Sequence, residues 1–324
     1  MMTGSRYEAV YREHGVTLSD REAGVEARIL PEYGNRASAV RVHGTNILWF
    51  PWDDSAPIAE KPSLNGIPFL APWGNRLDGG YRVKGAWHSL DGAELHRDAN
   101  GLPIHGLLYS PVTWQVTRVA GGAESASVTS RFDFAEHPEM MALWPFAHEY
   151  EMTYRLADGA LEVITTIRNK GTEAMPVAIG FHPYFTLAGV AREEIAVRVP
   201  AKSHVDADGR LLATGAFTPN ALPEWVRLDE HALDDGFIDL GRGADGLAQF
   251  TIAGGGRKIH VEFGPRYTVA IVYAPPGKEF VCVEPMATVT NGINLAAEGK
   301  YEGLQSVEAG GEWREAFRIR AEGF

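Results

Sequence analysis

A histidine among aromatic residues is the first candidate for chemistry in this chain. His182 lies in the segment Gly180–Phe185, which reads Gly-Phe-His-Pro-Tyr-Phe and directly follows the apolar run Met175–Gly180. Its neighbours are aromatic or are Pro, so the imidazole can be half-buried while one ring nitrogen stays available. Because the ordinary pKa of His lies near neutrality, such a residue can give or take a proton. Simple packing is the alternative explanation.

A glutamate at the end of an apolar strand is the second candidate. Glu284 follows the apolar run Phe280–Val283 and precedes Pro285. A carboxylate in this place is expected to be partly desolvated, which would raise its pKa and make it a better proton acceptor near neutrality. The alternative is an ordinary strand-end Glu that faces solvent. Of the candidate residues, His182 and Glu284 are the two for which a purely structural role is the weakest explanation.

Three other motifs carry polar groups suited to binding. The Asn75-Arg76 pair follows a Gly, and the planar guanidinium of Arg76 fits paired oxygens such as vicinal hydroxyls. The ring of His105, between Ile104 and a Gly, is expected to point inward. A functional Asp in the Asp234-Asp235 pair would accept hydrogen bonds from sugar hydroxyls. The alternatives are a structural Arg that binds loop carbonyls, a core His bonded to a carbonyl, and a solvated turn.

Short alternating runs must position these residues. Such runs, separated by Gly- and Pro-containing turns, predict an all-β sandwich. Few segments suggest helix, and we expect short helices at 138–144 and 224–232. The alternating runs are Ala37–Val42, Thr113–Val119, Ala126–Phe134, His148–Leu156, Leu161–Ile167, Ile195–Val199, Lys258–Phe263, Thr268–Tyr273, Phe280–Val283 and Phe317–Ile319.

Composition limits the possible partners and compartments. The chain has 324 residues and a net charge of −12, so its surface repels phosphate backbones and anionic lipids, and we expect neither nucleic acid nor membrane as partner. The one cysteine, Cys282, excludes a disulfide within the chain and a multi-cysteine zinc site. No spacing of potential ligands indicates a metal. Without a signal peptide or a transmembrane run, we expect a cytoplasmic protein with a single domain over residues 1–324.

Taken together, the motifs resemble the aldose 1-epimerase (mutarotase) family. The resemblance covers most of the chain and implies a β-supersandwich, like that of galactose mutarotase, with a sugar cleft on one face. It also implies that Glu284 is the general base and His182 the general acid, and that Asn75, Arg76, His105 and Asp234 bind the hydroxyls and ring oxygen of the sugar. The motifs that carry it occur in this order: Asn75-Arg76, His105-Gly106, Gly180–Phe185, Asp234-x-x-Phe237 and Cys282-Val283-Glu284-Pro285.

The resemblance therefore predicts an isomerase that interconverts the anomers of a free aldose without a cofactor, as a monomer or homodimer. The segment after Glu284, Pro285–Asn291, lacks the Gln and Asp of many galactose mutarotases, which leaves the preferred sugar open. A hexose-phosphate epimerase of the same superfamily is the nearest alternative and would need more Arg or Lys in the cleft. A non-catalytic carbohydrate-binding β-sandwich is another alternative, and a glycoside hydrolase, which needs a carboxylate pair, ranks last.

Overall fold

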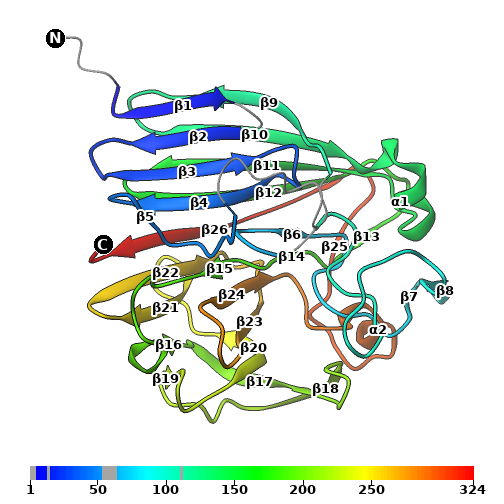
Figure 1. Cartoon of the computed structure of the whole chain (residues 1–324). Coiled ribbons are helices and arrows are strands. Elements are labelled where there is room, and N and C mark those ends of the chain that lie inside the picture. Colours follow the sequence, from blue (N-terminus) through cyan, green and yellow to red (C-terminus); the bar gives the residue numbers. More distant parts are fainter. Residues whose placement is uncertain (1–4, 13–14, 53–63, 110–111) are drawn as a thin grey trace.

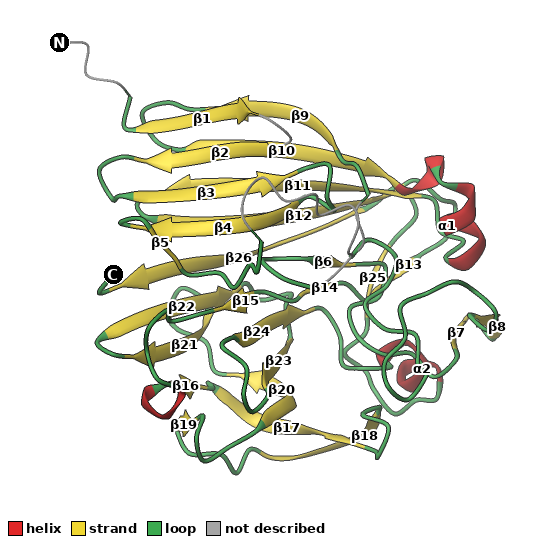
Figure 2. Cartoon of the chain, viewed as in Figure 1, coloured by secondary structure: helices red, strands yellow, loops and turns green. Residues whose placement is uncertain are grey.

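Antiparallel β-strands are the main secondary structure of the computed structural model, which describes residues 5–12, 15–52, 64–109 and 112–324. The strands form two broad layers that lie face to face, as Figure 1 and Figure 2 show. Every strand ladder among the described residues is antiparallel, so the predicted large β-sandwich, or supersandwich, is confirmed. No helix in the described part of the chain is long and apolar enough to cross a membrane.

The first layer contains two sheets that meet edge to edge. An antiparallel bridge joins Leu48 to Phe185, and the N–H of Trp49 donates to the carbonyl of Tyr184 at 2.9 Å. The smaller sheet has the order β1 (Tyr7–Arg12), β2 (Gly15–Asp20), β3 (Val25–Leu30), β4 (Arg36–Val42) and β5 (Thr45–Asn46).

The larger sheet of this layer carries the predicted site. Its order is β18 (Ala213–Pro219), β17 (Ala201–Ala207), β20 (Leu233–Leu240), β23 (Val269–Ala274), β24 (Val281–Met286), β14 (Gly180–Phe181) and β6 (Phe69–Leu70), and β15 (Tyr184–Phe185) also pairs with β24.

The second layer is a nine-stranded sheet that runs behind both sheets of the first. Its order is β19 (Trp225–Arg227), β16 (Ala196–Arg198), β21 (Ala248–Gly254), β22 (Arg257–Phe263), β26 (Glu312–Glu322), β12 (Ala160–Asn169), β11 (His148–Ala157), β10 (Ala126–Asp133) and β9 (Gln115–Ala120).

Small elements cover the ends of the sandwich. The hairpin of β7 (Gly80–Val83) and β8 (Ala86–Ser89) is one, and the long-range pair of β13 (Met175–Val177) and β25 (Gln305–Val307) is another. The helices are α1 (Pro138–Leu143), which the sequence predicts, α2 (Gly292–Ala297), which it does not, and the 3-10 turns η2 (Phe134–Glu136) and η3 (Arg192–Glu194).

The helix expected at 224–232 is wrong. Trp225–Arg227 forms β19, an edge strand that pairs with Ala196–Arg198, and a turn follows it. Val226 is buried against the core, whereas Trp225 and Arg227 on either side of it are exposed. This alternation has period two, and the β-branched and aromatic residues favour a strand where an edge is open for pairing.

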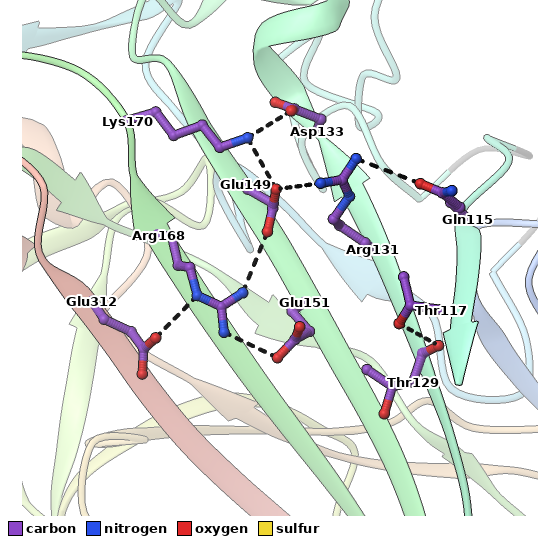
Figure 3. A network of polar contacts seen from close by, with 10 residues as sticks. All are labelled: Gln115, Thr117, Thr129, Arg131, Asp133, Glu149, Glu151, Arg168, Lys170 and Glu312. Carbon is purple, nitrogen blue, oxygen red and sulfur yellow. Dashed lines mark hydrogen bonds and ion pairs between the residues drawn. The ribbon is translucent and has the colours of Figure 1, made fainter. Parts of the chain in front are cut away.

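Charged side chains hold the outer face of the nine-stranded sheet together. On β11, Glu149 forms ion pairs with Arg131 of β10 at 3.2 Å, with Arg168 of β12 at 3.3 Å and with Lys170 at 2.9 Å. Figure 3 shows this network, in which carboxylates and cations alternate across neighbouring strands. Glu149 is buried although charged, and opposite charges on adjacent strands stabilise their pairing.

Phe181 anchors the site strand to the second layer. Its ring lies 5.0 Å from that of Phe69 on β6 and 4.8 Å from that of Phe317 on β26, and the residue is fully buried. Because side chains alternate along an extended chain, Phe181 and Phe185 point into the core while His182 and Tyr184 point to the opposite face. One hydrophobic cluster includes residues of all the large sheets, and we propose that residues 1–324 form one domain.

We predict that Phe181→Ala lowers the free energy of unfolding by about 3–5 kcal/mol, because it leaves a cavity between the two layers. Urea denaturation followed by tryptophan fluorescence measures this loss. Tyr11→Ala is the control, since Tyr11 is 49% exposed and its loss should stay within about 0.5 kcal/mol. A cost below about 1 kcal/mol for Phe181→Ala would contradict the described packing of the layers.

Candidate active site

Strand β24 carries Glu284 on the face opposite the core. Val283 beside it is buried in the main hydrophobic cluster, so Glu284 points the other way, where it is 1% exposed. Glu284 lies directly opposite Ile271 of β23, and Ile271 lies opposite Gly236 of β20. Residues opposite one another in an antiparallel ladder share a face, so this row of three belongs to one surface of the sheet.

His182 meets Glu284 on this surface. Its Nε2 lies 3.3 Å from the Oε1 of Glu284, and its ring stacks on Tyr184 with centroids 4.5 Å apart. The rings of His105 and Tyr273 approach it edge-on, at 5.3 and 6.1 Å. Its Nδ1 is buried and has no hydrogen-bond partner among the described residues. The fold therefore brings together the two residues that are 102 positions apart in the sequence, 284 − 182.

Burial shifts the pKa values of the pair in opposite directions. Desolvation raises the pKa of Glu284 well above its ordinary value, the charge of Asp234 raises it further, and the positive charge of Arg76 opposes this. Desolvation likewise lowers the pKa of His182, and His105 adds to the effect. Both shifts penalise charge in a buried place, so the ligand-free pair favours a neutral imidazole beside a protonated carboxyl group. The raised pKa of Glu284 agrees with the expectation from sequence.

His105 lies at the edge of this pair in a left-handed backbone conformation. Its φ is +68°, and its Nδ1 is 3.1 Å from the carbonyl oxygen of Gly74. A side chain at the next residue, Gly106, would collide with the carbonyl of Ala71, which explains the glycine there. Burial lowers the pKa of His105 to about 3, so the ring is neutral at working pH. The ring points inward, as predicted, and the carbonyl contact matches the structural alternative as well.

Arg76 is held by two side chains. Its Nε donates to the Oδ2 of Asp98 at 2.7 Å, and its Nη1 donates to the Oδ1 of Asn75 at 3.3 Å. The other oxygen of Asp98 accepts hydrogen bonds from the backbone N–H groups of Asn100 and Leu102. Burial would raise the pKa of Asp98, but the bonds from Arg76 and from these N–H groups outweigh it and lower the pKa below its ordinary value. These two bonds fix the guanidinium in one orientation, and its Nη2 takes part in neither of them.

Sequence reasoning did not find Asp98. The residue begins the loop Asp-Ala-Asn-Gly-Leu, in which an Asp that accepts the N–H two residues later signals a turn. Nothing in that pattern indicates an ion pair with an Arg 22 positions earlier. The ring of Tyr273 beside His182 was also missed, because strand alternation alone does not say which rings converge.

A pocket beside Glu284 contains three of the other predicted residues. Asn75, Arg76 and Asp234 line it together with apolar side chains that include Leu211 and Ile271. Asp234 lies at the rim of the pocket and is exposed as a residue. Neighbouring protein still partly desolvates its carboxylate and raises its pKa. The positive charge of Arg76 opposes this rise, and the charge of Asp235 adds to it. Asp235 instead contacts the Nε2 of His204 at 2.8 Å, which supports Asp234 as the pocket residue of the pair.

All six predicted residues therefore lie around one part of the sheet surface. A second hollow, lined by Leu48, Trp49 and Phe185 among others, contains none of them. The cations that a phosphate group would need lie elsewhere: Arg82 donates to the carbonyl of Gly85, and Lys84 pairs with Glu173 at 3.3 Å at the exposed β7–β8 end. One potential metal-ligand set occurs among the described residues, namely His182, Cys282 and Glu284.

Comparison with known proteins assigns the fold and the family. A family model described as aldose 1-epimerase matches residues 16–320. A galactose mutarotase-like protein from Clostridium acetobutylicum has a TM-score of 0.86 and 20% identity, with 98% of both chains covered. A galactose 1-epimerase from Lactobacillus acidophilus has a TM-score of 0.75 and 14% identity, again with 98% of both chains covered. At these identities the structural likeness concerns the fold.

Two relatives match part of the sequence. The galactose mutarotase of Homo sapiens is 27% identical over 145 residues, which are 43% of this chain and 40% of that protein. The uncharacterized protein YihR of Escherichia coli is 31% identical over 144 residues, 44% of this chain and 43% of that protein. The chain thus matches less than half the length of each relative.

We predict that Asp98→Asn lowers the free energy of unfolding by about 2 kcal/mol at neutral pH, because Arg76 loses its charged partner. The Asn side chain keeps an oxygen that can accept the backbone N–H groups of Asn100 and Leu102. The lowered pKa of Asp98 means that its carboxylate stabilises the fold above the unfolded value of about 3.9 and that this contribution vanishes as the pH falls through the folded value. The difference between variant and wild type should therefore shrink below about pH 4. Urea denaturation at both pH values measures it.

Asp229→Asn is the matched control for this prediction. Asp229 pairs with Arg227 at 2.7 Å but in a more exposed place, with 34% of its side chain accessible. Its replacement should cost less than about 0.5 kcal/mol. A loss for Asp98→Asn that is equally large in acid would show that the charge of Asp98 is not what stabilises the loop.

Proposed function

Because the chain belongs to the aldose 1-epimerase family, we propose that it is an isomerase that interconverts the α and β anomers of a free aldose such as glucose or galactose. The contact of 3.3 Å between His182 and Glu284 carries this proposal. The reaction needs an acid and a base at two oxygens bonded to the same carbon, the C1 hydroxyl and the ring oxygen. Two groups that lie this close together can reach both oxygens at once.

In the proposed reaction the pair moves one proton in each direction. Glu284 takes the proton of the C1 hydroxyl while His182 gives a proton to the ring oxygen, and the bond between C1 and the ring oxygen breaks. The aldehyde then rotates about its bond to the next carbon. Closure on the other face returns both protons, so the enzyme ends as it began. These groups suffice for the chemistry, and each contributes about 10²–10⁴-fold.

In the reactive state the two residues share one transferable proton, and the reaction depends on which of them carries it. In the ligand-free site, burial favours the proton on Glu284, whereas the reaction begins with Glu284 ionised and His182 protonated. The two arrangements contain the same number of protons, so no exchange with solvent is needed to pass between them. Sugar hydroxyls that donate to the carboxylate, and the positive charge of Arg76, would favour the ionised form. We propose that substrate binding shifts the proton to His182.

The remaining residues are proposed to bind the sugar. Asn75 and Arg76 line the pocket from one side and Asp234 from its rim, so they can hold hydroxyls at the end away from C1. Neutral His105, with Nδ1 directed to a carbonyl, can offer its other ring nitrogen near His182. Among the described residues that line the pocket, Arg76 is the one cation. Together with the outward direction of Arg82 and Lys84, this favours a free aldose over a phosphorylated one.

We predict that the protein accelerates the relaxation of pure α-D-glucose or α-D-galactose to the anomeric mixture. Glu284→Gln and His182→Ala should each lower kcat by about 10²–10⁴-fold, because each removes one proton-transfer group. Polarimetry of freshly dissolved sugar measures the rates, and circular dichroism checks the fold. His204→Ala is the control, since His204 contacts Asp235 outside the pair and should keep wild-type kcat.

Relaxation no faster than in buffer for both sugars would contradict the proposed activity on them. Near-wild-type kcat in either variant would remove that residue from its assigned role, whatever the overall activity.

We also predict a bell-shaped dependence of kcat/KM on pH, because the active pair holds one proton. In acid the pair takes up a second proton, which leaves no base, and in alkali it loses its proton, which leaves no acid. Since burial lowers the pKa of His182, the acid limb should lie below about pH 6.5, the ordinary value for His. Rates from about pH 4 to about pH 9 test this. A rate that rises steadily with pH would instead indicate a base acting without an acid.

A further inference from the structure

We propose that His182, Cys282 and Glu284 form a binding site for Zn²⁺ or a similar thiophilic divalent cation, and that such an ion blocks the site of proton transfer. The three side chains offer a ring nitrogen, a sulfur and a carboxylate oxygen, and these ligand atoms all lie within 4.8 Å of one another. Mixed nitrogen, sulfur and oxygen donors of this kind are the ligands that zinc prefers in proteins. The inference goes beyond the proposed function and needs no sugar chemistry.

One strand and the adjoining link between two others hold the three ligands: β24 carries Cys282 and Glu284, and His182 lies between β14 and β15. Cys282 and Glu284 are two residues apart on β24, so they project from the same face. Cys282 lies directly opposite Tyr184 of β15, which is two residues after His182. The ligands are thus held by paired backbone on a sheet, which gives a more rigid site than loops would.

The separation of the ligand atoms fits one ion. Zinc bonds of about 2.0–2.3 Å at tetrahedral angles place ligand atoms about 3.3–3.8 Å apart. The Nε2 of His182 and the Oε1 of Glu284 are already 3.3 Å apart. The sulfur of Cys282 lies within 4.8 Å of the other two ligand atoms, so a side-chain movement of about 1–1.5 Å would bring it to this spacing.

The ion has a physical reason to enter this buried place. All three ligands are buried, and a divalent cation would compensate the charges of a carboxylate and a thiolate together. Any path that admits a sugar to the pair also admits a smaller ion. On binding, the thiol of Cys282 and the carboxyl of Glu284 release their protons to solvent. An ion bound to His182 and Glu284 would occupy both proton-transfer groups, so it should inhibit.

Cobalt absorption tests the site directly. The purified protein is treated with a chelator, freed of it and titrated with Co²⁺, whose bond to a thiolate gives a charge-transfer band in the near ultraviolet. We expect one Co²⁺ per chain, appearance of this band, and its loss when Zn²⁺ displaces Co²⁺. Cys282→Ser keeps the size of the side chain but cannot supply a thiolate, so it should abolish the band and weaken Zn²⁺ binding by at least about 10-fold.

Two variants serve as matched controls. His204→Ala removes a more exposed His that lies between Asp206 and Asp235, and it should leave both the band and the Zn²⁺ affinity unchanged. Cys282→Ala repeats the test if Cys282→Ser does not fold. Co²⁺ binding to folded wild-type protein without the thiolate band, or equal Zn²⁺ affinity in wild type and a Cys282 variant, would overturn the proposal and leave Cys282 a packing residue only.

Inhibition separates this proposal from the epimerase proposal. If the chain interconverts anomers, Zn²⁺ should slow the reaction in wild type and His204→Ala but at least about 10-fold less potently in Cys282→Ser. A cobalt band without any anomer conversion would support the metal site and count against the epimerase. Anomer conversion without the band would do the reverse.

Discussion

The burial of an acid–base pair is the constraint on which the site depends. His182 and Glu284 are 6% and 1% exposed, and burial opposes charge on either of them. A pair in this condition shares its proton at short range, and a small change in its surroundings can decide which partner holds it. The other groups of the site act on that balance: Arg76 favours the ionised carboxylate, and Asp234 opposes it.

Strand alternation is what makes the burial possible. On β24 and on the segment that contains β14 and β15, alternate residues go to the core and to the site, so one strand serves both. Phe181 and Val283 fix the backbone from behind, which leaves His182 and Glu284 little freedom to separate. Gly180 leaves room for Met286 on the paired strand, because a side chain there would collide with its sulfur. The geometry of the site is therefore a consequence of packing in the core.

The sequence predicts these features unequally for physical reasons. Period-two runs and strand-end residues such as Glu284 depend on local pattern, so the sheets and the candidate residues could be predicted. The segment 224–232 was misjudged because an available sheet edge decided its conformation, and that edge is a tertiary property. Asp98 was missed because its turn is local whereas its ion pair with Arg76 is not. The approach of Cys282 to His182 likewise depends on strand pairing, which no residue spacing reveals.

Charge around Arg76 bears on the proposed preference for an uncharged sugar. The guanidinium is surrounded by Asp98 at 2.7 Å, by Asp234 across the pocket and by the buried Glu284. Asp98 pairs with the guanidinium and leaves less of its charge for a phosphate group, and the nearby carboxylate of Asp234 would repel one. Hydroxyl groups meet no such penalty, since they can donate to carboxylates and accept from the guanidinium at the same time. On the proposed function, the arrangement that positions Arg76 would thus also select against charged substrates.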